Sequence, residues 1–229
     1  MLILGIETSG RRGSVALCAE GGTIARHRFA EGPRNARHIM PAIDDIVRDS
    51  GTEKTDIDAV GVSEGPGSFT GLRVGVTCAK TLAYSLGWDA VGVPSLEVLV
   101  QNLTGGTLAC PLRDARRSCV YADVFERRDG RWVDRTGVML GRPQGIARRI
   151  PPGTVIFGSG RKAYPDIFAQ STDKNWKTAP AGTGEGRAEA VASVALRILA
   201  EKGATPPMEL VPKYHRKTAA ETNVENRNS

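Results

Sequence analysis

The sequence lacks the patterns that mark membrane-spanning and metal-binding proteins. No uninterrupted apolar run in its 229 residues approaches the roughly 20 that a membrane-spanning helix needs, so we expect no membrane association. Its four cysteines form no CxxC pair and its three histidines no HxxxH or HExxH pair, so no metal site is expected. No basic segment precedes the apolar N-terminal residues, so we expect no signal peptide. A cytoplasmic protein is therefore predicted.

The composition is that of a globular protein, with 40% hydrophobic and 24% charged residues. The length allows one large domain or two small ones. Lys and Arg number 31 against 25 Asp and Glu, which gives a net charge of +6. This excess permits contact with nucleic acid but does not require it, since a solvated basic surface explains it equally well.

The first hundred residues alternate between β-prone runs and helical patterns. Strands are predicted over 2–7, 13–19, 23–29, 56–63 and 90–93, and helices over 35–50, 70–86 and 95–102. Gly21-Gly22 signals a hairpin turn between the second and third strands. The order predicts an α/β fold with a mixed sheet, in which the first three strands are antiparallel and the later ones parallel.

The second half resembles a degenerate copy of the first. Strands are predicted over 108–112, 118–126, 131–139 and 154–157, and helices over 143–150 and 188–202. This repetition suggests a duplicated α/β unit. We therefore expect an N-terminal lobe over residues 1–104, a C-terminal lobe over 105–219 and a flexible tail over 220–229.

A glycine-rich stretch, Ser63–Gly75, follows a strand and opens a helix, where free backbone N–H groups can bind an anion. It has no Gly-Lys pair, so it is not a Walker A loop, and its third glycine falls one position late for GxGxxG. Within the helix we favour a packing role for a stripe of small residues. The stripe comprises Gly71, Gly75, Cys78 and Ala79.

Gly61-Val62-Ser63-Glu64-Gly65 formally matches the GxSxG nucleophile elbow. The elbow needs a helix directly after its serine, whereas Pro66 and Gly67 intervene here. The only histidine available downstream is His215, in a basic segment. A serine hydrolase is therefore a minor alternative.

Two turns are candidates for a nucleotide cleft. Glu7-Thr8-Ser9 places an acid and two hydroxyls at a strand-to-strand turn, which in a two-lobed fold would face the cleft and contact phosphate and Mg²⁺. Gly158-Ser159-Gly160 is a comparable turn in the second half. A turn that is merely rich in hydrogen-bonding residues explains the first equally well. We expect no intrinsic cofactor; the alternative is ATP or ADP with Mg²⁺, bound in the cleft or at a partner interface.

Several segments resemble one protein family. They are Ile6-Glu7-Thr8-Ser9, Gly65-Pro66-Gly67-Ser68-Phe69-Thr70-Gly71-Leu72-Arg73-Val74-Gly75 and Val91-Gly92-Val93-Pro94-Ser95-Leu96, with weaker likeness at Asp114-Ala115-Arg116-Arg117 and Pro212-Lys213-Tyr214. They are similar to the TsaB (YeaZ) family of tRNA threonylcarbamoyladenosine biosynthesis proteins, in the TsaD/YeaZ superfamily. The resemblance covers essentially the whole chain.

The resemblance implies an actin-like, Hsp70-like ATPase (ASKHA) fold of two RNase H-like lobes. It also implies membership of a complex that transfers a threonylcarbamoyl group to adenosine 37 of tRNA, with the catalytic paralogue TsaD and a TsaE-type ATPase as partners. TsaD holds a metal through an HxxxH pair, which this sequence lacks, so we expect a non-catalytic scaffold subunit with no catalytic residue of its own. The alternatives are an ATP-dependent ASKHA-type phosphotransferase and a glycoprotease-like hydrolase.

The helices over 35–50 and 70–86 are expected to pack against the paralogue, or against a second copy in a homodimer when the chain is alone. Periodicity does not separate core from contact roles among the candidate partner-binding residues. They are Ile39, Ile43, Ser68, Thr70, Gly71, Leu72, Arg73, Gly75, Val76 and Ala79.

Any contact with tRNA is expected to be weak, electrostatic and secondary. The candidates are Arg113, Arg116, Arg117, Arg127, Arg128, Lys213, Arg216 and Lys217. Acidic residues interleave the first five, so a solvated surface is the favoured role for them.

Overall fold

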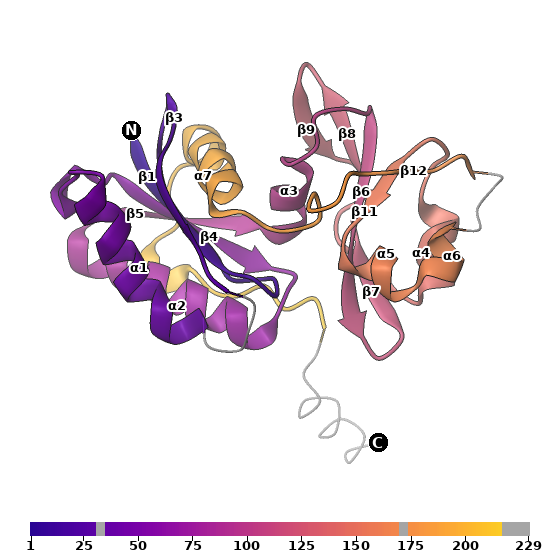
Figure 1. The fold of residues 1–229 in the computed structure, drawn as a ribbon, viewed down its shortest axis with the longest axis horizontal. Coiled ribbons are helices and arrows are strands. Elements are labelled where there is room, and N and C mark those ends of the chain that lie inside the picture. The colour runs from indigo at the N-terminus through magenta and orange to yellow at the C-terminus, as the bar shows by residue number, and fades with distance from the viewer. Residues whose placement is uncertain (31–34, 170–173, 217–229) are drawn as a thin grey trace, which may run out of the picture.

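The computed structural model describes residues 1–30, 35–169 and 174–216. Lys217 and the tail predicted over 220–229 lie outside the described residues. Figure 1 shows two lobes, each built on a β-sheet, with the last described residues running between them. Among the described residues no helix is long and apolar enough to cross a membrane.

The first lobe contains a five-stranded sheet in the order β3-β2-β1-β4-β5. The strands are β1 (Leu2–Glu7), β2 (Ser14–Ala19), β3 (Gly22–Arg28), β4 (Ala59–Gly65) and β5 (Asp89–Pro94). β1 pairs with β2 antiparallel and with β4 parallel. The predicted mixed sheet is thus confirmed, including the switch from antiparallel to parallel pairing.

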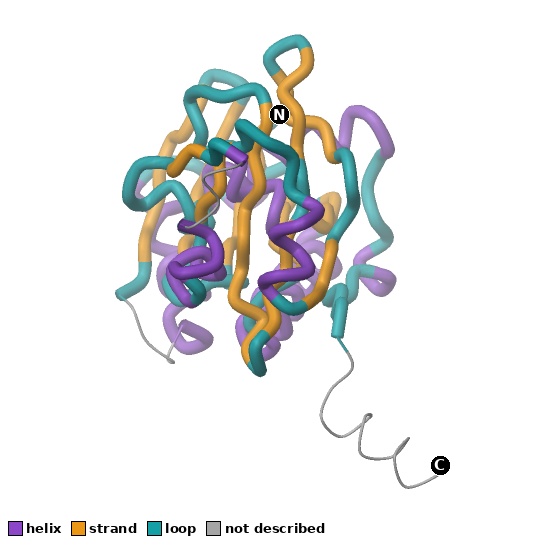
Figure 2. The backbone as a smooth tube through the Cα atoms, turned by 90° about the vertical axis from the view of Figure 1, so that its right-hand side faces the viewer, coloured by secondary structure: helices purple, strands orange, loops and turns teal. Residues whose placement is uncertain are grey.

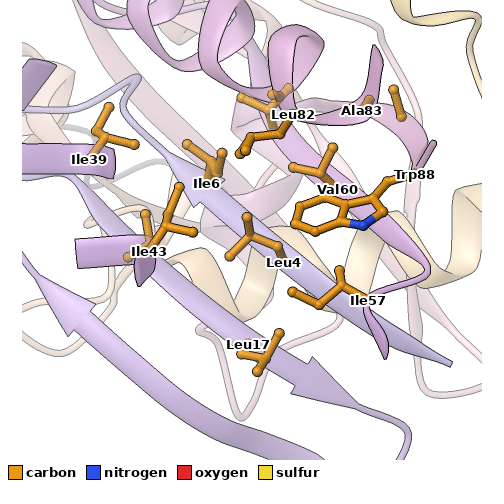
Figure 3. Close-up of a cluster of buried hydrophobic side chains, with 14 of the residues drawn as sticks. Leu4, Ile6, Leu17, Ile39, Ile43, Ile57, Val60, Leu82, Ala83 and Trp88 are labelled. Carbon is orange, nitrogen blue, oxygen red and sulfur yellow. The ribbon is translucent and has the colours of Figure 1, made fainter. Parts of the chain in front are cut away.

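Helices α1 (Asn35–Asp49) and α2 (Phe69–Leu86) cover one face of this sheet. α2 begins where the Ser68 side chain accepts a hydrogen bond from the Gly71 N–H, and it ends at Gly87, which has a left-handed φ of 72°. Figure 3 shows the core beneath the helices, where Leu4 and Ile6 of β1 meet Ile43 of α1 and Leu82 of α2.

Helix α7 (Ala188–Lys202) covers the opposite face of the same sheet (Figure 1). Its apolar residues pack with Ile3 of β1 and Val91 of β5, the side chains that alternate with those facing α1 and α2. A Cβ atom on Gly5 or Gly61 would collide with α7, so these glycines permit close approach. The assignment of residues 188–202 to the second lobe is therefore wrong, while the division of the chain near residue 104 stays a prediction.

The second sheet has the order β10-β7-β6-β11-β12, with β8 paired to β6 and β9 to β8. Its strands are β6 (Leu108–Arg116), β7 (Cys119–Ala122), β8 (Phe125–Arg128), β9 (Arg131–Asp134), β10 (Met139–Gly141), β11 (Val155–Phe157) and β12 (Lys177–Thr178). The turn between β6 and β7 and the turn between β8 and β9 lie at opposite ends of this lobe (Figures 1 and 2).

Short helices complete the molecule. They are α3 (Ser95–Val100), α4 (Pro143–Arg149), α5 (Ser159–Ala163) and α6 (Pro165–Ala169), with 3₁₀ turns η1 (Lys54–Asp56) and η3 (Pro207–Glu209). The single strands predicted over 118–126 and 131–139 are each interrupted. β9 ends because the Asp134 carboxylate accepts hydrogen bonds from the N–H groups of Thr136 and Gly137, which bends the chain away from the sheet.

Candidate functional site

The Glu7 carboxylate lies at the end of β1 and is fully buried. Its Oε1 accepts hydrogen bonds from the backbone N–H of Ser9, at 2.6 Å, and from the Ser9 hydroxyl. Its Oε2 accepts one from the Ser63 hydroxyl at the end of β4. Both carboxylate oxygens are therefore engaged by the protein itself.

Thr8 fixes α2 against the same turn. Its hydroxyl donates a 2.7 Å hydrogen bond to the Gly71 carbonyl oxygen. A Cβ atom on Gly71 would overlap the Thr8 carbonyl, and one on Gly75 would overlap the Thr8 hydroxyl. The glycines of the small-residue stripe thus allow α2 to pack on the turn, as the packing interpretation of the stripe predicts.

Arg113 reaches this turn from β6 of the second lobe. Its Nη1 donates a 2.7 Å hydrogen bond to the Ser9 carbonyl oxygen, and its guanidinium is buried. Burial lowers the pKa of Arg113, while the nearby Glu7 charge acts in the opposite direction. A Cβ atom on Gly67 would lie 2.8 Å from Nη1, so Gly67 leaves the space that the guanidinium fills.

The second predicted turn lies apart from the first. Gly158 packs against Gly184, and Gly186 packs against Glu7: a Cβ atom on Gly184 would lie 2.6 Å from the Gly158 Cα, and one on Gly186 would lie 2.7 Å from the Glu7 Cδ. The segment before α7 therefore passes between the two turns. Ser159 opens helix α5, and its hydroxyl accepts a hydrogen bond from the Asp114 N–H.

These contacts decide how the six candidate cleft residues suit a nucleotide. Only Ser159 is exposed; the other five are buried. Glu7, Thr8 and Ser9 are at most 2% exposed, so a phosphate could contact their side chains only if neighbouring residues moved. The turn therefore does not fit a bound nucleotide in this arrangement, and the hydrogen-bonding interpretation of Glu7-Thr8-Ser9 describes it better.

The GxSxG match has a structural explanation too. Ser63 is buried and donates its hydroxyl hydrogen to Glu7. The ring of His215 lies beside Tyr121 of the second lobe, with ring centroids 6.3 Å apart. Ser63 thus holds the β1 turn, and the exposed serine that a nucleophile elbow presents is not formed.

An apolar groove of about 500 Å³ runs between α1 and α2. It is lined by Ile39, Met40, Arg73, Val74, Thr77, Cys78, Thr81 and Leu82. Met40 is 43% exposed at its rim, and the Cys78 thiol lies 3.5 Å from the Met40 sulfur. Burial raises the pKa of Cys78 to about 11, so the thiol is neutral at physiological pH.

The structure separates the ten candidate partner-binding residues. Those buried inside the lobe are Ile39, Ile43, Leu72, Gly75, Val76 and Ala79. Those at least partly accessible are Ser68, Thr70, Gly71 and Arg73. The structure thus gives the buried six the core role, one of the two roles that periodicity left open, and Ile39 also lines the groove between α1 and α2. Partner binding by the accessible four stays a prediction. Two exposed residues of the groove, Thr77 and Thr81, were missed because threonine gives no apolar signal.

The C-terminal segment, residues 212–216, joins the lobes, which no sequence pattern predicted. The Lys213 ammonium lies 2.6 Å from the Glu64 carboxylate, and Tyr214 stacks on Phe69 with ring centroids 4.9 Å apart. The Arg216 Nη1 then donates to the carbonyl oxygens of Ala115 and Arg116 in the second lobe. The segment therefore connects the start of α2 to the turn between β6 and β7.

Comparisons with known proteins identify a family and relatives that this chain resembles. A family model described as "TsaD: tRNA N6-adenosine threonylcarbamoyltransferase" matches residues 33–223. The Escherichia coli protein named "tRNA threonylcarbamoyladenosine biosynthesis protein TsaB" is 34% identical over 179 residues, which cover 75% of this chain and 77% of that protein.

The solved structures agree on the fold. YeaZ from Pseudomonas aeruginosa superposes with a TM-score of 0.80 at 22% identity, over 93% of this chain and 99% of that one. A ROK hexokinase from Thermus thermophilus gives a TM-score of 0.53 at 12% identity, over 88% and 100%. This likeness confirms the predicted actin-like ATPase fold. The chain belongs to the TsaB (YeaZ) family of the tRNA threonylcarbamoyladenosine biosynthesis proteins.

Proposed function

We propose that this chain acts in tRNA threonylcarbamoyladenosine biosynthesis as a non-catalytic subunit that docks a TsaD-type paralogue through α1 and α2. Its family membership and its match to the TsaD model support the process and the kind of partner. The observation that carries the docking site is the apolar groove between the two helices.

The outer face of α2 has the composition of an interface. Only Arg73 and Lys80 are charged among its 18 residues. The exposed positions Thr77, Thr81 and Tyr84 are uncharged, and Tyr84 is 73% exposed. Surfaces depleted of charge and containing an exposed aromatic residue are typical of protein–protein contacts, so a helix of the partner would bury this face.

The remaining partners follow from the same arrangement. In the absence of the paralogue a second copy would cover the groove, which gives an isologous homodimer. ATP or ADP would bind elsewhere in the assembled complex, because the Glu7 turn of this chain is already engaged by its own residues. A TsaE-type ATPase would join the same complex. The buried Glu7, Thr8 and Ser9 then serve the fold of the subunit.

Docking is tested with Thr77→Arg, which places a charge in the groove at an exposed position. The matched control is Ser193→Arg, at an exposed position of α7 on the opposite face of the sheet. Co-elution with the cognate TsaD-type paralogue is measured by size-exclusion chromatography. We expect Thr77→Arg to abolish co-elution and Ser193→Arg to preserve it, with both variants folded by circular dichroism. Co-elution of a folded Thr77→Arg variant would refute the docking site.

The same preparations test the phosphotransferase alternative. ATP turnover is measured for the chain alone, for the paralogue alone and for the two together with tRNA and a TsaE-type ATPase. A non-catalytic subunit shows no turnover alone and restores modification when added to the others. Turnover by the isolated chain would favour the phosphotransferase.

A further inference from the structure

We infer that the turn between β6 and β7, together with the C-terminal segment that crosses it, binds the sugar–phosphate backbone of RNA. This inference rests on the proposed function, which places tRNA beside the subunit. The turn comprises Arg116, Arg117 and Ser118, and is called the arginine turn below.

The backbone of the arginine turn is in an unfavourable conformation. Arg116, Arg117 and Ser118 have φ values of 61°, 49° and 55°, all in the left-handed region. Two-residue hairpin turns of this kind favour Asn-Gly or Asp-Gly, and the β8–β9 turn of the same lobe has Asp129-Gly130. Residues held in such conformations cluster at functional sites, so a turn that keeps Arg-Arg-Ser indicates a role for the side chains.

The two arginine side chains extend into solvent. Arg116 is 81% exposed and lies 3.3 Å from the Asp114 carboxylate. Arg117 is exposed and has no hydrogen-bond or ion-pair partner among residues 1–30, 35–169 and 174–216. A hairpin tip with two protruding guanidinium groups can contact successive phosphates, because each group donates two parallel hydrogen bonds to one phosphate.

The C-terminal segment adds cations and holds the turn in place. Arg216 donates hydrogen bonds of 3.0 and 3.3 Å to the carbonyl oxygens of Ala115 and Arg116. Lys213 is 62% exposed beside Glu64. Four cations thus face two carboxylates, those of Asp114 and Glu64, along this edge. The excess is positive, and it bridges the two lobes.

The edge adjoins the proposed docking face. Tyr214 stacks on Phe69, and the Arg73 Nε donates a 3.0 Å hydrogen bond to its hydroxyl. Arg73 also lines the α1–α2 groove. The C-terminal segment therefore connects the arginine turn, through Arg216, to the rim of the groove, through Tyr214 and Arg73.

The other predicted tRNA contacts do not join this edge. The Arg127 guanidinium donates to the carbonyl oxygens of Leu103 and Thr104 and stacks on Trp132. Arg128 pairs with Glu126 and ends β8, and the β8–β9 turn lies at the opposite end of the lobe from the arginine turn (Figures 1 and 2). Arg113 is buried. Of the seven candidates that lie within the described residues, the edge therefore keeps Arg116, Arg117, Lys213 and Arg216.

The test compares two paired substitutions in full-length chain bound to its paralogue. Arg116→Gln/Arg117→Gln removes both charges of the arginine turn, and Arg128→Gln/Arg131→Gln removes the two arginines flanking the β8–β9 turn. Binding of fluorescently labelled tRNA is measured by anisotropy over a series of salt concentrations. We expect the first variant to lose about tenfold in affinity at low salt and to reduce the salt slope by about 2, since each released phosphate contact contributes close to 1. The control should match the wild type.

A second variant separates RNA binding from turn stability. Arg117→Asn/Ser118→Gly provides the turn sequence that the left-handed backbone prefers, so its melting temperature should rise while its tRNA affinity falls. A structural role alone predicts unchanged affinity.

Two results would overturn the inference: equal tRNA affinity in the wild type and the Arg116→Gln/Arg117→Gln variant, or equal losses in that variant and the control. Equal tRNA affinity together with weakened binding of the paralogue would assign the edge to an acidic protein surface. The proposed function is tested separately, and its docking site is refuted if the folded Thr77→Arg variant still co-elutes with the paralogue. The two failures are therefore distinguishable.

Discussion

The buried guanidinium of Arg113 donates a 2.7 Å hydrogen bond to the carbonyl oxygen of Ser9, and this contact joins β6 of the second lobe to the β1 turn of the first. In actin-like folds a nucleotide can occupy such a position between the lobes. Here a side chain of the second lobe contacts the first lobe directly. We interpret Arg113 as part of the structural connection between the lobes rather than as a residue that contacts tRNA.

Arg113→Met should therefore destabilise the protein. The methionine fills part of the space but leaves the buried Ser9 carbonyl without its charged donor, which costs about 1.5–3 kcal/mol of unfolding free energy. Urea denaturation followed by circular dichroism measures the loss. Arg131→Met, at an exposed position of β9, is the control and should change stability by less than about 0.5 kcal/mol. Equal stability of the two variants would show that the inter-lobe hydrogen bond contributes nothing.

Two helical glycines should respond in opposite directions to alanine. A Cβ atom on Gly75 of α2 would overlap the Thr8 hydroxyl, whereas one on Gly145 of α4 would meet no atom within 4 Å. Gly75→Ala should therefore destabilise by about 1–3 kcal/mol through overpacking. Gly145→Ala should stabilise by about 0.5–1 kcal/mol, because alanine loses less conformational freedom in a helix.

Thermal unfolding of both glycine variants measures these shifts. The comparison also decides the role of the small-residue stripe. If Gly75→Ala retained wild-type stability but failed to bind the paralogue, the stripe would face the partner and the assignment of Gly75 to the interior would be wrong.

Local patterns predicted most elements of the first lobe because they depend on neighbouring residues. The alternation of Ile3 and Leu4 between the two sheet faces produces β1, and the glycine at 87 ends α2. The face that α7 covers depends on contacts with β1, far away in the sequence, and no local pattern contains that information. The helix was therefore assigned to the wrong lobe although its predicted bounds, 188–202, agree with the structure.

In the candidate site, too, local patterns identify the residues, whereas contacts with residues distant in the sequence decide their role. Glu7, Thr8 and Ser9 carry polar groups that suit either a ligand or a hydrogen-bonded turn. The choice is made by Ser63, which is 56 residues away, and by Arg113, which is 104 residues from Ser9. The apolar periodicity of α1 and α2 identified the residues that build the lobe, whereas the groove is completed by threonines that such periodicity does not detect.

The last prediction concerns a buried carboxyl group in the second lobe, that of Asp123. Asp123 is 3% exposed, and the Thr136 hydroxyl donates a 3.0 Å hydrogen bond to its Oδ1. Burial, and then the charge and hydrogen bonding of Asp134, raise the pKa of Asp123 to about 7. In the unfolded chain the same carboxyl has its ordinary pKa of 3.8.

The sign of the pH dependence follows from the raised pKa. Below about pH 4 the carboxyl is protonated in both states, and its contribution to stability is fully present. As the pH rises towards 7, the unfolded chain releases the proton while the folded protein retains it, so the free energy of unfolding falls. Asp123→Asn cannot titrate, and its amide can still accept from Thr136 and donate to Asp134.

The melting temperature of Asp123→Asn relative to the wild type should therefore increase between pH 4.5 and pH 8. We expect a relative gain of about 5 °C, because 1 kcal/mol moves the melting temperature of a chain of this size by about 2–4 °C. Asp166→Asn, at an exposed position of α6, is the control and should show a constant difference from the wild type over this range. A constant difference for Asp123→Asn as well would mean that Asp123 is ionised in the folded protein throughout, and that Thr136 and the Val124 N–H outweigh burial at this site.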